Sequence, residues 1–325
     1  MSFDFQASAG AWITPLPHRE ILVACSGGAD SMALLHYART LLQAGSLDRL
    51  ACAHFNHNLR TEAVDDENFV RGFCLTSGIE FFKGEADVAA EAARLKRGIE
   101  ETARVLRYGF LESVAVREGF PCVCTAHNRD DNMETMLFNL TRGTGPSGLC
   151  GIKQTRGIFF RPMLDITRAE IEAYIAQNGV NHIEDASNAD TCYSRNKLRH
   201  LALPVLREIN SAAAEAFSRT AEFLRADEDY FELETARILS TAIQTPEGLG
   251  LPVNILSELH PAMAGRVCRA LCAKAGIIPE AVHIRDMLGL LGKFQPAMIN
   301  LPKGVVARRR KKMLIVGKTG GVPNG

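Results

Sequence analysis

The sequence predicts an α/β protein with a doubly wound, mostly parallel sheet, followed by a smaller, mainly helical domain. Two observations carry this prediction. In the first two hundred residues, short apolar segments of strand length alternate with longer segments whose apolar residues recur at helical spacing. In addition, three polar segments each begin where a predicted strand ends, and parallel sheets bind ligands beyond the carboxyl ends of their strands. The near-continuous apolar strands indicate a sheet covered on both faces.

Strands and helices are expected to alternate along this part of the chain. Strands are predicted at Glu20–Cys25, Leu50–Phe55, Ile79–Lys83 and Pro121–Ala126. Helices are predicted at Met32–Gln43, Glu62–Thr76, Ile99–Arg117 and Asp131–Thr141. One more helix, Ala169–Gln177, opens with a capping box at Thr167-Arg-Ala-Glu170 and ends at Asn178-Gly179.

The chain is expected to divide into a catalytic sheet domain, residues 1–210, and a helical domain, residues 211–325. Glycines become sparse after Asn210, and Ala212–Leu239 is predicted to form one or two long helices. From Lys303 onwards there is no acidic residue, and Arg308-Arg-Arg-Lys-Lys312 forms a compact basic cluster in the expected C-terminal tail. Such a run is either a solvated surface or a contact for the phosphate backbone of a nucleic acid.

Composition narrows the classes of function. The 325 residues are 46% hydrophobic, and 37 basic residues balance 37 acidic ones, so nucleic-acid binding must depend on a local patch and not on net charge. Neither a secretion leader nor an apolar run of membrane-spanning length is recognisable, which predicts a cytoplasmic protein without membrane partners. The nine cysteines, which include no CxxC pair, predict reduced core thiols and argue against a zinc knuckle or a sulfur-transfer enzyme.

The most informative segment is Ile21–Ser31, an apolar strand followed by Ser26-Gly27-Gly28-Ala29-Asp30-Ser31. The glycines allow backbone N–H groups to approach phosphate oxygens, and the next helix turns the positive end of its dipole to the same point. A Walker loop would need a Lys-Ser or Lys-Thr pair that is absent here, and Asp30 suits a metal ion better than a phosphate. The alternative is a tight turn with a capping Asp or Ser.

A second polar segment, His54-Phe-Asn-His-Asn-Leu-Arg60, closes a predicted strand. His54 and His57 can bind metals, but no third ligand stands nearby in the sequence, so capping or contact with a nucleotide is favoured. Asn58 is one of the few residue types other than glycine that tolerate a positive φ.

A third polar segment follows the fourth predicted strand and contains His127, Asp131 and Glu134. Asp131 and Glu134 stand three residues apart and share a helix face, so this carboxylate pair can address one ligand. The alternative is an acidic helix N-terminus favoured by the dipole alone. The glycine-rich stretch 139–148 follows a helix and contains Pro146, so its GxGxxG pattern indicates a mobile substrate loop and not a dinucleotide site.

A fourth polar segment comprises Glu184-Asp-Ala-Ser-Asn-Ala-Asp190 and Arg195-Asn-Lys-Leu-Arg199. Arg195 and Arg199 stand four residues apart and share a helix face, which suits the capture of a carboxylate or a phosphate. The alternative is an ordinary exposed helix.

Together these segments resemble the tRNA-modifying branch of the N-type ATP pyrophosphatases. The resemblance covers residues 20 to 200 and rests on motifs in a fixed order: SGGxDS at Ser26, HxNHxLR at His54, ARxxRY at Ala103, AHxxDDxxET at Ala126, RGxGxxGLxGI at Arg142, EDxSNxD at Glu184 and RNxLR at Arg195. The chain departs from the family pattern at Asn58, Asn128 and Ala186, where the family usually has Gly, His and Pro.

The resemblance implies an enzyme that uses ATP and Mg²⁺ to adenylate the wobble cytidine of a tRNA(Ile) with a CAU anticodon, after which free L-lysine displaces AMP and leaves lysidine. The basic tail and the helical domain would contact the tRNA. Two rivals stay open: another adenylating enzyme of tRNA modification, such as a 2-thiolase, and a nucleotide-binding regulator without turnover. A homodimer is compatible with the sequence.

The resemblance also implies roles for individual residues. Nucleotide contacts fall to Ser26, Gly27, Gly28, Ala29, Asp30, Ser31, His54 and Asn56. Catalytic roles fall to Asp30, which would also hold the metal, and to Asp131, Glu134 and Arg107, with Arg104 as the alternative to Arg107 for the phosphates. Contacts with lysine or tRNA fall to His127, Asp131, Glu134, Arg142, Arg195 and Arg199.

Overall fold

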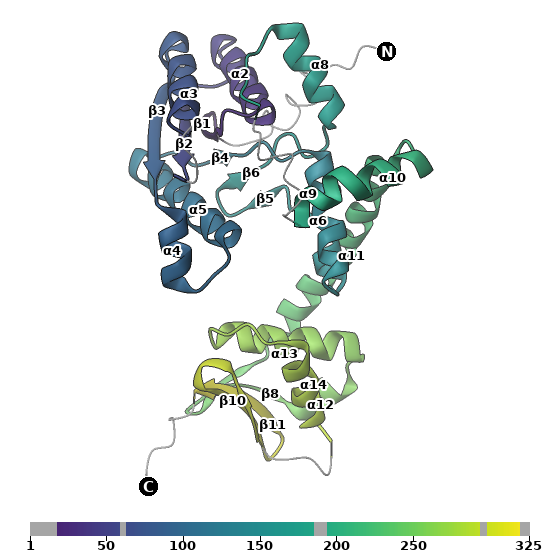
Figure 1. Ribbon diagram of the computed structural model, residues 1–325. Coiled ribbons are helices and arrows are strands. Elements are labelled where there is room, and N and C mark those ends of the chain that lie inside the picture. The colour runs from purple at the N-terminus through teal and green to yellow at the C-terminus, as the bar shows by residue number, and fades with distance from the viewer. Residues whose placement is uncertain (1–17, 59–62, 185–193, 293–297, 319–325) are drawn as a thin grey trace. The chain divides into compact units, whose positions relative to one another are not determined.

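The computed structural model describes residues 18–58, 63–184, 194–292 and 298–318. It consists of two compact units, Met1–Leu224 and Arg225–Gly325 (Figure 1). The sequence suggested a domain boundary after residue 210. The division between the two compact units falls later, inside helix α11 (Ala213–Leu239). The physical reason is that the first turns of α11 still pack on the first unit, where Ala213 and Phe217 join a small core around Leu203.

The first unit is built on a six-stranded sheet with the order β3-β2-β1-β4-β6-β5. Its strands are β1 (Glu20–Ala24), β2 (Arg49–Asn56), β3 (Glu80–Glu85), β4 (Val123–Cys124), β5 (Thr155–Arg156) and β6 (Phe159–Phe160). All neighbours pair in parallel except β5 and β6. This confirms the predicted doubly wound, mostly parallel sheet. After β3 the chain returns to the other side of β1, so the crevice between the ends of β1 and β4 is the expected binding site.

Helices cover the sheet as the sequence predicted, with ends that differ by only a few residues. They are α2 (Ala29–Gln43), α3 (Ala63–Ser77), α4 (Val88–Leu95), α5 (Ile99–Glu118), α6 (Arg129–Thr141), α7 (Pro146–Leu149), α8 (Arg168–Asn178), α9 (Ser194–Lys197), the π-helical turn η2 (Leu198–Ala202) and α10 (Leu203–Ile209). Helices α4 and α10, the short α7 and the strands β5 and β6 were not predicted from the sequence. No helix in the described ranges is long and apolar enough to span a membrane.

Two separate apolar cores lie on the two faces of the sheet. Side chains of β1 alternate between them, because Ile21 and Val23 join a core with α2, α3 and α8, whereas Leu22 joins a core with α5. The predicted capping box opens α8, since Thr167 Oγ1 accepts from the Glu170 N–H at 3.2 Å and Glu170 Oε2 accepts from the Thr167 N–H at 2.7 Å.

Helix α8 is held against α2 by a buried tyrosine. The Tyr174 hydroxyl lies 2.8 Å from His36 Nδ1, and its ring meets the Tyr37 ring edge to face at a centroid distance of 6.4 Å. Tyr174 itself is only 4% exposed. This packing positions α8 relative to α2.

The second unit combines helices with an antiparallel sheet that was not predicted from the sequence. Its helices are the end of α11, α12 (Val253–Glu258), α13 (Pro261–Lys274) and α14 (Ala281–Gly289), followed by the 3-10 turn η3 (Pro302–Gly304). Its sheet has the order β7-β8-β11-β10-β9 and comprises β7 (Ile243–Thr245), β8 (Gly248–Pro252), β9 (Met298–Leu301), β10 (Val305–Arg310) and β11 (Met313–Lys318). Figure 1 shows the long pair β10 and β11 beside the helices.

The basic cluster lies in this sheet and is not a tail. Arg308, Arg309 and Arg310 belong to β10, and the turn to β11 follows at Lys311 and Lys312. The Arg308 and Arg310 guanidinium groups both pair with Glu247, which explains how a strand accommodates this charge. The Arg309 guanidinium donates to the carbonyl groups at the end of α14, including that of Leu290.

Candidate functional site

The glycine loop (Ser26–Ser31) leaves the end of β1 and enters α2, and its backbone requires glycine at position 27. Gly27 has a φ of +95°, a conformation that other residues rarely adopt. A Cβ atom there would lie 2.8 Å from Ile183 Cδ1. The Ile183 N–H donates to the Gly27 carbonyl at 2.9 Å, which ties the loop to the segment after α8.

Helix α2 presents an uncapped N-terminus beside this loop. Its N-cap residue is Gly28, which has no side chain that could accept a hydrogen bond from the first N–H groups of the helix. Ala29, the first helical residue, adds no polar side chain. An uncapped N-terminus attracts anions through its N–H groups and its dipole. This backbone geometry is compatible with the phosphate loop that the sequence suggests, and phosphate binding at this loop stays a prediction.

Two serine hydroxyls organise the loop. Ser31 Oγ donates to the Gly28 carbonyl at 2.9 Å and accepts from the Ser26 N–H at 3.2 Å. The two hydroxyl oxygens also lie 3.2 Å apart. Ser31 is buried and braces the loop from inside, whereas Ser26 is exposed and presents its hydroxyl at the surface.

Asp30, in the first turn of α2, pairs with an arginine from a distant helix. Arg168 Nη1 donates to Asp30 Oδ1 at 2.7 Å from the first residue of α8. Burial raises the pKa of Asp30 to about 6, against the opposing effect of Arg168 and with a smaller contribution from the nearby charge of Asp131. From the sequence, Arg168 was recognised only as part of a capping box, because no local pattern connects it with Asp30.

Asp131 and Glu134 of α6 face one guanidinium. Arg199 Nε donates to Glu134 Oε1 at 2.6 Å, and Arg199 Nη2 donates to Asp131 Oδ1 at 3.1 Å. The predicted shared face of the two acids is therefore confirmed. The Glu134 side chain is 4% exposed, so its charge needs a partner inside the protein. Arg199 belongs to η2, and single π-helical turns often mark functional sites.

Asp131 also caps its own helix. The Asn128 N–H donates to Asp131 Oδ2 at 3.0 Å, and Asn128 Oδ1 accepts from the Asp131 N–H at 2.9 Å. Asp131 therefore stabilises the N-terminus of α6 and also shares a helix face with Glu134. Asp130 lies on another side of the helix, where it pairs with Arg207 at 2.8 Å.

These groups form one charged cluster, which we define as Asp30, Asp131, Glu134, Arg168 and Arg199. The charges of Arg168, Asp131 and Arg199 all act on the pKa of Asp30. Burial lowers the pKa of Arg199, but the three acids of the cluster raise it. The fold brings the cluster together from the ends of β1 and β4 and from two helices near residues 168 and 199. Four of its five members were predicted site residues; Arg168 is the addition.

Two of the predicted nucleotide contacts, His54 and Asn56, lie near the end of β2. His54 Nδ1 lies 2.9 Å from the Cys25 carbonyl, and burial lowers the pKa of His54, so the neutral ring donates this hydrogen bond. Asn56 donates to the Ala63 carbonyl at 3.1 Å and accepts from the Asn58 N–H at 2.9 Å. Asn58 has a φ of +49°, as its residue type suggested.

Arg107 lies on this side of the site. Burial first, and then Arg107, lower the pKa of His57 to about 4. The guanidinium carbons of Arg107 and Arg104 lie 5.8 Å and 5.0 Å from the Tyr108 ring centroid. Neither arginine is among the main charges that act on Asp30.

Two further predicted residues flank helix α6. His127 Nδ1 lies 2.9 Å from Thr125 Oγ1 at the end of β4. Arg142 caps the opposite end of α6, where its guanidinium carbon lies 5.3 Å from the Phe138 ring centroid, so the structure does not bring it to Asp131. Three predictions lie outside the described residues: Arg60, the segment 185–190 and the side chain of Arg195.

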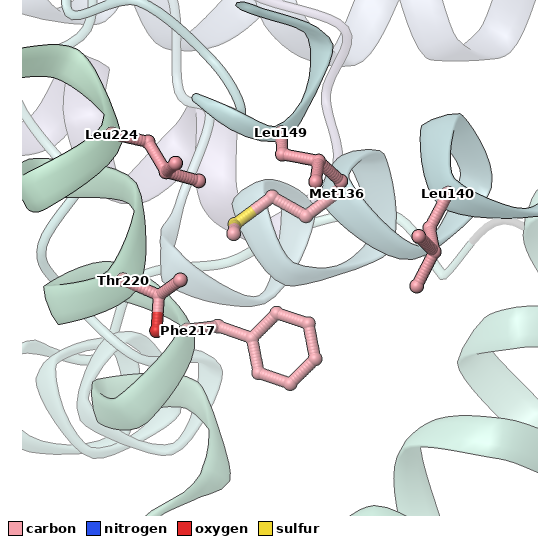
Figure 2. Close-up of a pocket in the computed structure, with 6 residues that line it drawn as sticks. All are labelled: Met136, Leu140, Leu149, Phe217, Thr220 and Leu224. Atoms are coloured by element: carbon pink, nitrogen blue, oxygen red, sulfur yellow. The ribbon is translucent and has the colours of Figure 1, made fainter. Parts of the chain in front are cut away.

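An apolar cavity of about 200 Å³ lies behind α6, between α7 and the first part of α11 (Figure 2). It is lined by Met136, Leu140, Leu149, Phe217, Thr220 and Leu224. No predicted site residue lines it, so the charged cluster and this cavity are separate features.

Among the known proteins similar to this chain are three tRNA(Ile)-lysidine synthases. The protein of Pseudothermotoga lettingae is 41% identical over 203 residues, which are 62% of this chain and 45% of the relative. That of Chlorobaculum tepidum is 40% identical over 221 residues, 67% of this chain and 66% of the relative. That of Deinococcus radiodurans is 37% identical over 292 residues, 90% of this chain and 47% of the relative. The chain thus spans about half to two thirds of these relatives' lengths.

The fold is similar to that of a solved structure, and the sequence matches a family model. The U34-tRNA thiolase NcsA from Methanococcus maripaludis, with its [4Fe-4S] cluster, superposes with a TM-score of 0.57 at 16% identity, over 67% of this chain and 77% of that chain. This likeness concerns the fold alone. The model of the PP-loop domain matches residues 1–206. The chain therefore belongs to the PP-loop domain family.

Proposed function

We propose that the chain attaches free L-lysine to C2 of the wobble cytidine in a tRNA(Ile) with a CAU anticodon. The observation that carries this proposal is the charged cluster, where two acids suited to an amine and one arginine suited to a carboxylate adjoin the glycine loop. The similarity to tRNA(Ile)-lysidine synthases supports the same substrates.

In the first step, the C2 carbonyl oxygen of the cytidine attacks the α-phosphorus of ATP. A P–O bond forms, the bond between the α-phosphorus and the bridging oxygen breaks, and pyrophosphate leaves with that bond's electron pair. The uncapped start of α2 and the Ser26 hydroxyl would hold the phosphates, because they present hydrogen-bond donors to an anion. His54 and Asn56 would border the adenine from the neighbouring strand.

The donor set fits a magnesium ion that arrives with the nucleotide. Among the described residues, no group of three or more His, Cys, Asp or Glu side chains could hold a metal by itself. Mg²⁺ commonly uses one or two carboxylates together with substrate phosphates and water. Asp30 is the carboxylate within the glycine loop, and bound Mg²⁺ would offset the charge that develops on the leaving pyrophosphate.

In the second step, the ε-amine of lysine attacks C2 of the adenylated cytidine. A C–N bond forms, the C2–O bond breaks, AMP leaves, and the nitrogen gives up a proton. Since the amine has a reference pKa of about 10.4, only a fraction on the order of 10⁻³ is unprotonated near neutral pH. Asp131 and Glu134 would orient the amine and accept its proton, and Arg199 would bind the α-carboxylate. Holding lysine at C2 supplies proximity that free solution lacks.

The test is an assay of AMP release by the full chain with ATP, Mg²⁺, lysine and a CAU-anticodon tRNA(Ile). We expect AMP release to depend on lysine and on the tRNA, and we expect digestion of the tRNA to yield a lysine-bearing cytidine. A tRNA with the same body and a changed wobble base is the matched control. AMP release that is indifferent to lysine, or sulfur at the wobble base, would assign the chain to another reaction.

A further inference from the structure

The glycine loop carries no cation of its own. The segment from Ser26 to Leu35 contains no Lys or Arg, although the loop is the proposed site of a pyrophosphate with several negative charges. Hydrogen bonds from backbone N–H groups satisfy part of that charge, and a neighbouring guanidinium or ammonium usually supplies the rest. The missing cation must come from another part of the fold.

Arg168 is the arginine that the fold brings to the loop. Its Nη1 donates to Asp30 Oδ1 at 2.7 Å, and its Nε donates to Glu172 Oε1 at 2.9 Å. The Arg168 side chain is 42% exposed, so it can exchange partners without leaving a buried core. Since the Tyr174 contact holds α8 against α2, the base of this side chain is fixed beside the glycine loop.

Other arginines serve this position less well. Arg104 and Arg107 lie over Tyr108, and Arg107 acts on His57 at the end of β2. The charge of Arg199, unlike those of Arg104 and Arg107, acts on Asp30, but Arg199 already pairs with Glu134 and Asp131. Arg168 alone among these arginines has a loop carboxylate as its main partner.

We propose that Arg168 binds the pyrophosphate portion of ATP, and that it is released from Asp30 when a divalent cation takes its place there. The inference rests on the proposed function only in that ATP is the ligand. In the protein without ligands, Arg168 neutralises Asp30. When a divalent cation arrives at Asp30, this guanidinium becomes the surplus charge beside the phosphates, whose oxygens match its planar donors.

The experiment is isothermal titration of the full chain, in Mg²⁺, with inorganic pyrophosphate, α,β-methylene ATP and AMP. We expect Arg168→Gln to weaken the binding of pyrophosphate and of α,β-methylene ATP by about 10- to 100-fold, because a charge-assisted contact is lost. The affinity for AMP should change by less than about 3-fold. Arg168→Lys should recover part of the loss, because it restores the charge without the planar donors.

Controls separate this role from a structural one. Glu172→Gln removes the other partner of Arg168 and should leave all three affinities within about 3-fold of the wild type. Melting temperatures of all variants show whether they fold. The proposal would be overturned if Arg168→Gln left the affinity for pyrophosphate unchanged or lowered the affinity for AMP by the same factor. It would also be overturned if Arg107→Gln lowered the affinity for pyrophosphate by a larger factor. A chain that binds pyrophosphate through Arg168 but forms no lysidine would instead refute the proposed function alone.

Discussion

Arg199 and Glu134 form the closest ion pair in the charged cluster, with 2.6 Å between Arg199 Nε and Glu134 Oε1. The same guanidinium reaches Asp131, so one side chain occupies both acids that we propose for the lysine amine. An incoming ammonium group must therefore replace the guanidinium, and Arg199 must then find another anion. Lysine supplies both charges, since its α-carboxylate can take Arg199 while its amine takes the acids.

This exchange predicts discrimination against amines without a carboxylate. Cadaverine has the same chain and a primary amine, but its binding would leave the Arg199 charge beside an ammonium group without compensation. We expect the wild type to favour lysine over cadaverine by at least about 10-fold in AMP release with ATP and tRNA. We expect Arg199→Gln to lose activity with lysine and to narrow or invert this ratio.

The matched control for this prediction is Arg207→Gln. Arg207 pairs with Asp130 on another side of α6, so its loss should leave the ratio of lysine to cadaverine unchanged. Equal use of the two amines by the wild type would contradict the exchange of charge partners.

A second prediction concerns Asp131→Asn. The asparagine can still accept the Asn128 N–H, so the helix cap should persist and stability should fall by no more than about 1 kcal/mol. The proton acceptor for the lysine amine is lost, so we expect ATP binding to persist while lysine transfer falls by about 100-fold or more. Titration with α,β-methylene ATP and digestion of the tRNA product measure the two effects. Full transfer in this variant would remove Asp131 from the proposed role.

How far the sequence predicted this site depended on the range of each interaction. The shared face of Asp131 and Glu134 follows from helical spacing, which a single sequence shows. Arg168 and Asp30 are 138 residues apart, and their contact depends on how α8 packs against α2. No local pattern encodes that packing, so Arg168 was missed.

The same limit explains the fold. The parallel sheet has buried, apolar strands such as β1, and these are recognisable in the sequence. The antiparallel sheet was missed because its strands carry contrary signals. Gly248 and Gly317 lie so close to neighbouring backbone that only glycine fits there, and glycines lower the strand signal. The charges of Arg308 and Arg310 suggested a solvated tail because their partner, Glu247, lies far away in the sequence.

A third prediction separates backbone strain from ligand binding at Gly27. Alanine at this φ of +95° should destabilise the protein by about 1 to 2 kcal/mol. Gly45→Ala is the control for backbone conformation, because Gly45 has a φ of +70° and no atom of the described residues lies within 4 Å of the place that an added methyl group would occupy. We expect a larger loss of unfolding free energy in Gly27→Ala, because its methyl group also lies 2.8 Å from Ile183 Cδ1, and we expect weaker binding of pyrophosphate only in Gly27→Ala. Equal pyrophosphate affinities would show that the conformation of Gly27 does not shape the anion site.

A fourth prediction concerns the pH dependence of stability at His57. Its pKa is about 4 in the folded protein, below the ordinary value near 6.5, so the unfolded chain takes up a proton first as the pH falls. The contribution of His57 is therefore complete above pH 6.5 and is lost progressively as the pH falls towards 4. Between pH 7 and pH 5 this amounts to about 1 to 2 kcal/mol.

The variant His57→Gln isolates this effect, because glutamine does not titrate. Chemical unfolding at pH 7 and pH 5 should show a smaller loss for His57→Gln than for the wild type. Equal losses in the two proteins would mean that His57 is not held neutral by its surroundings. The charge of Arg107 contributes to the lowered pKa of His57. The stability loss of Arg107→Gln between pH 7 and pH 5 should therefore lie between those of the wild type and His57→Gln.

The last prediction assigns separate roles to the basic residues near the end of the chain. Arg308 pairs with Glu247, and both side chains are about nine-tenths buried, at 13% and 12% exposure. Arg308→Gln should therefore lower stability by about 2 kcal/mol, less than a full buried-pair loss because Arg310 still accompanies Glu247. Lys311 and Lys312 are exposed at the β-turn, where they are available to RNA phosphates.

Removing these two lysines should affect RNA binding and not folding. Lys311 has a φ of +52°, so Lys311→Asn, combined with Lys312→Gln, removes the charges while respecting the backbone. Each phosphate contact contributes about 0.9 to the slope of log affinity against log salt on duplex nucleic acid, so the double variant should reduce the slope by at most about 2. Binding of tRNA at several salt concentrations measures it. An unchanged slope would show that these two lysines make no phosphate contact, whereas an equal loss in Arg308→Gln at full stability would show that the paired arginine also reaches the RNA.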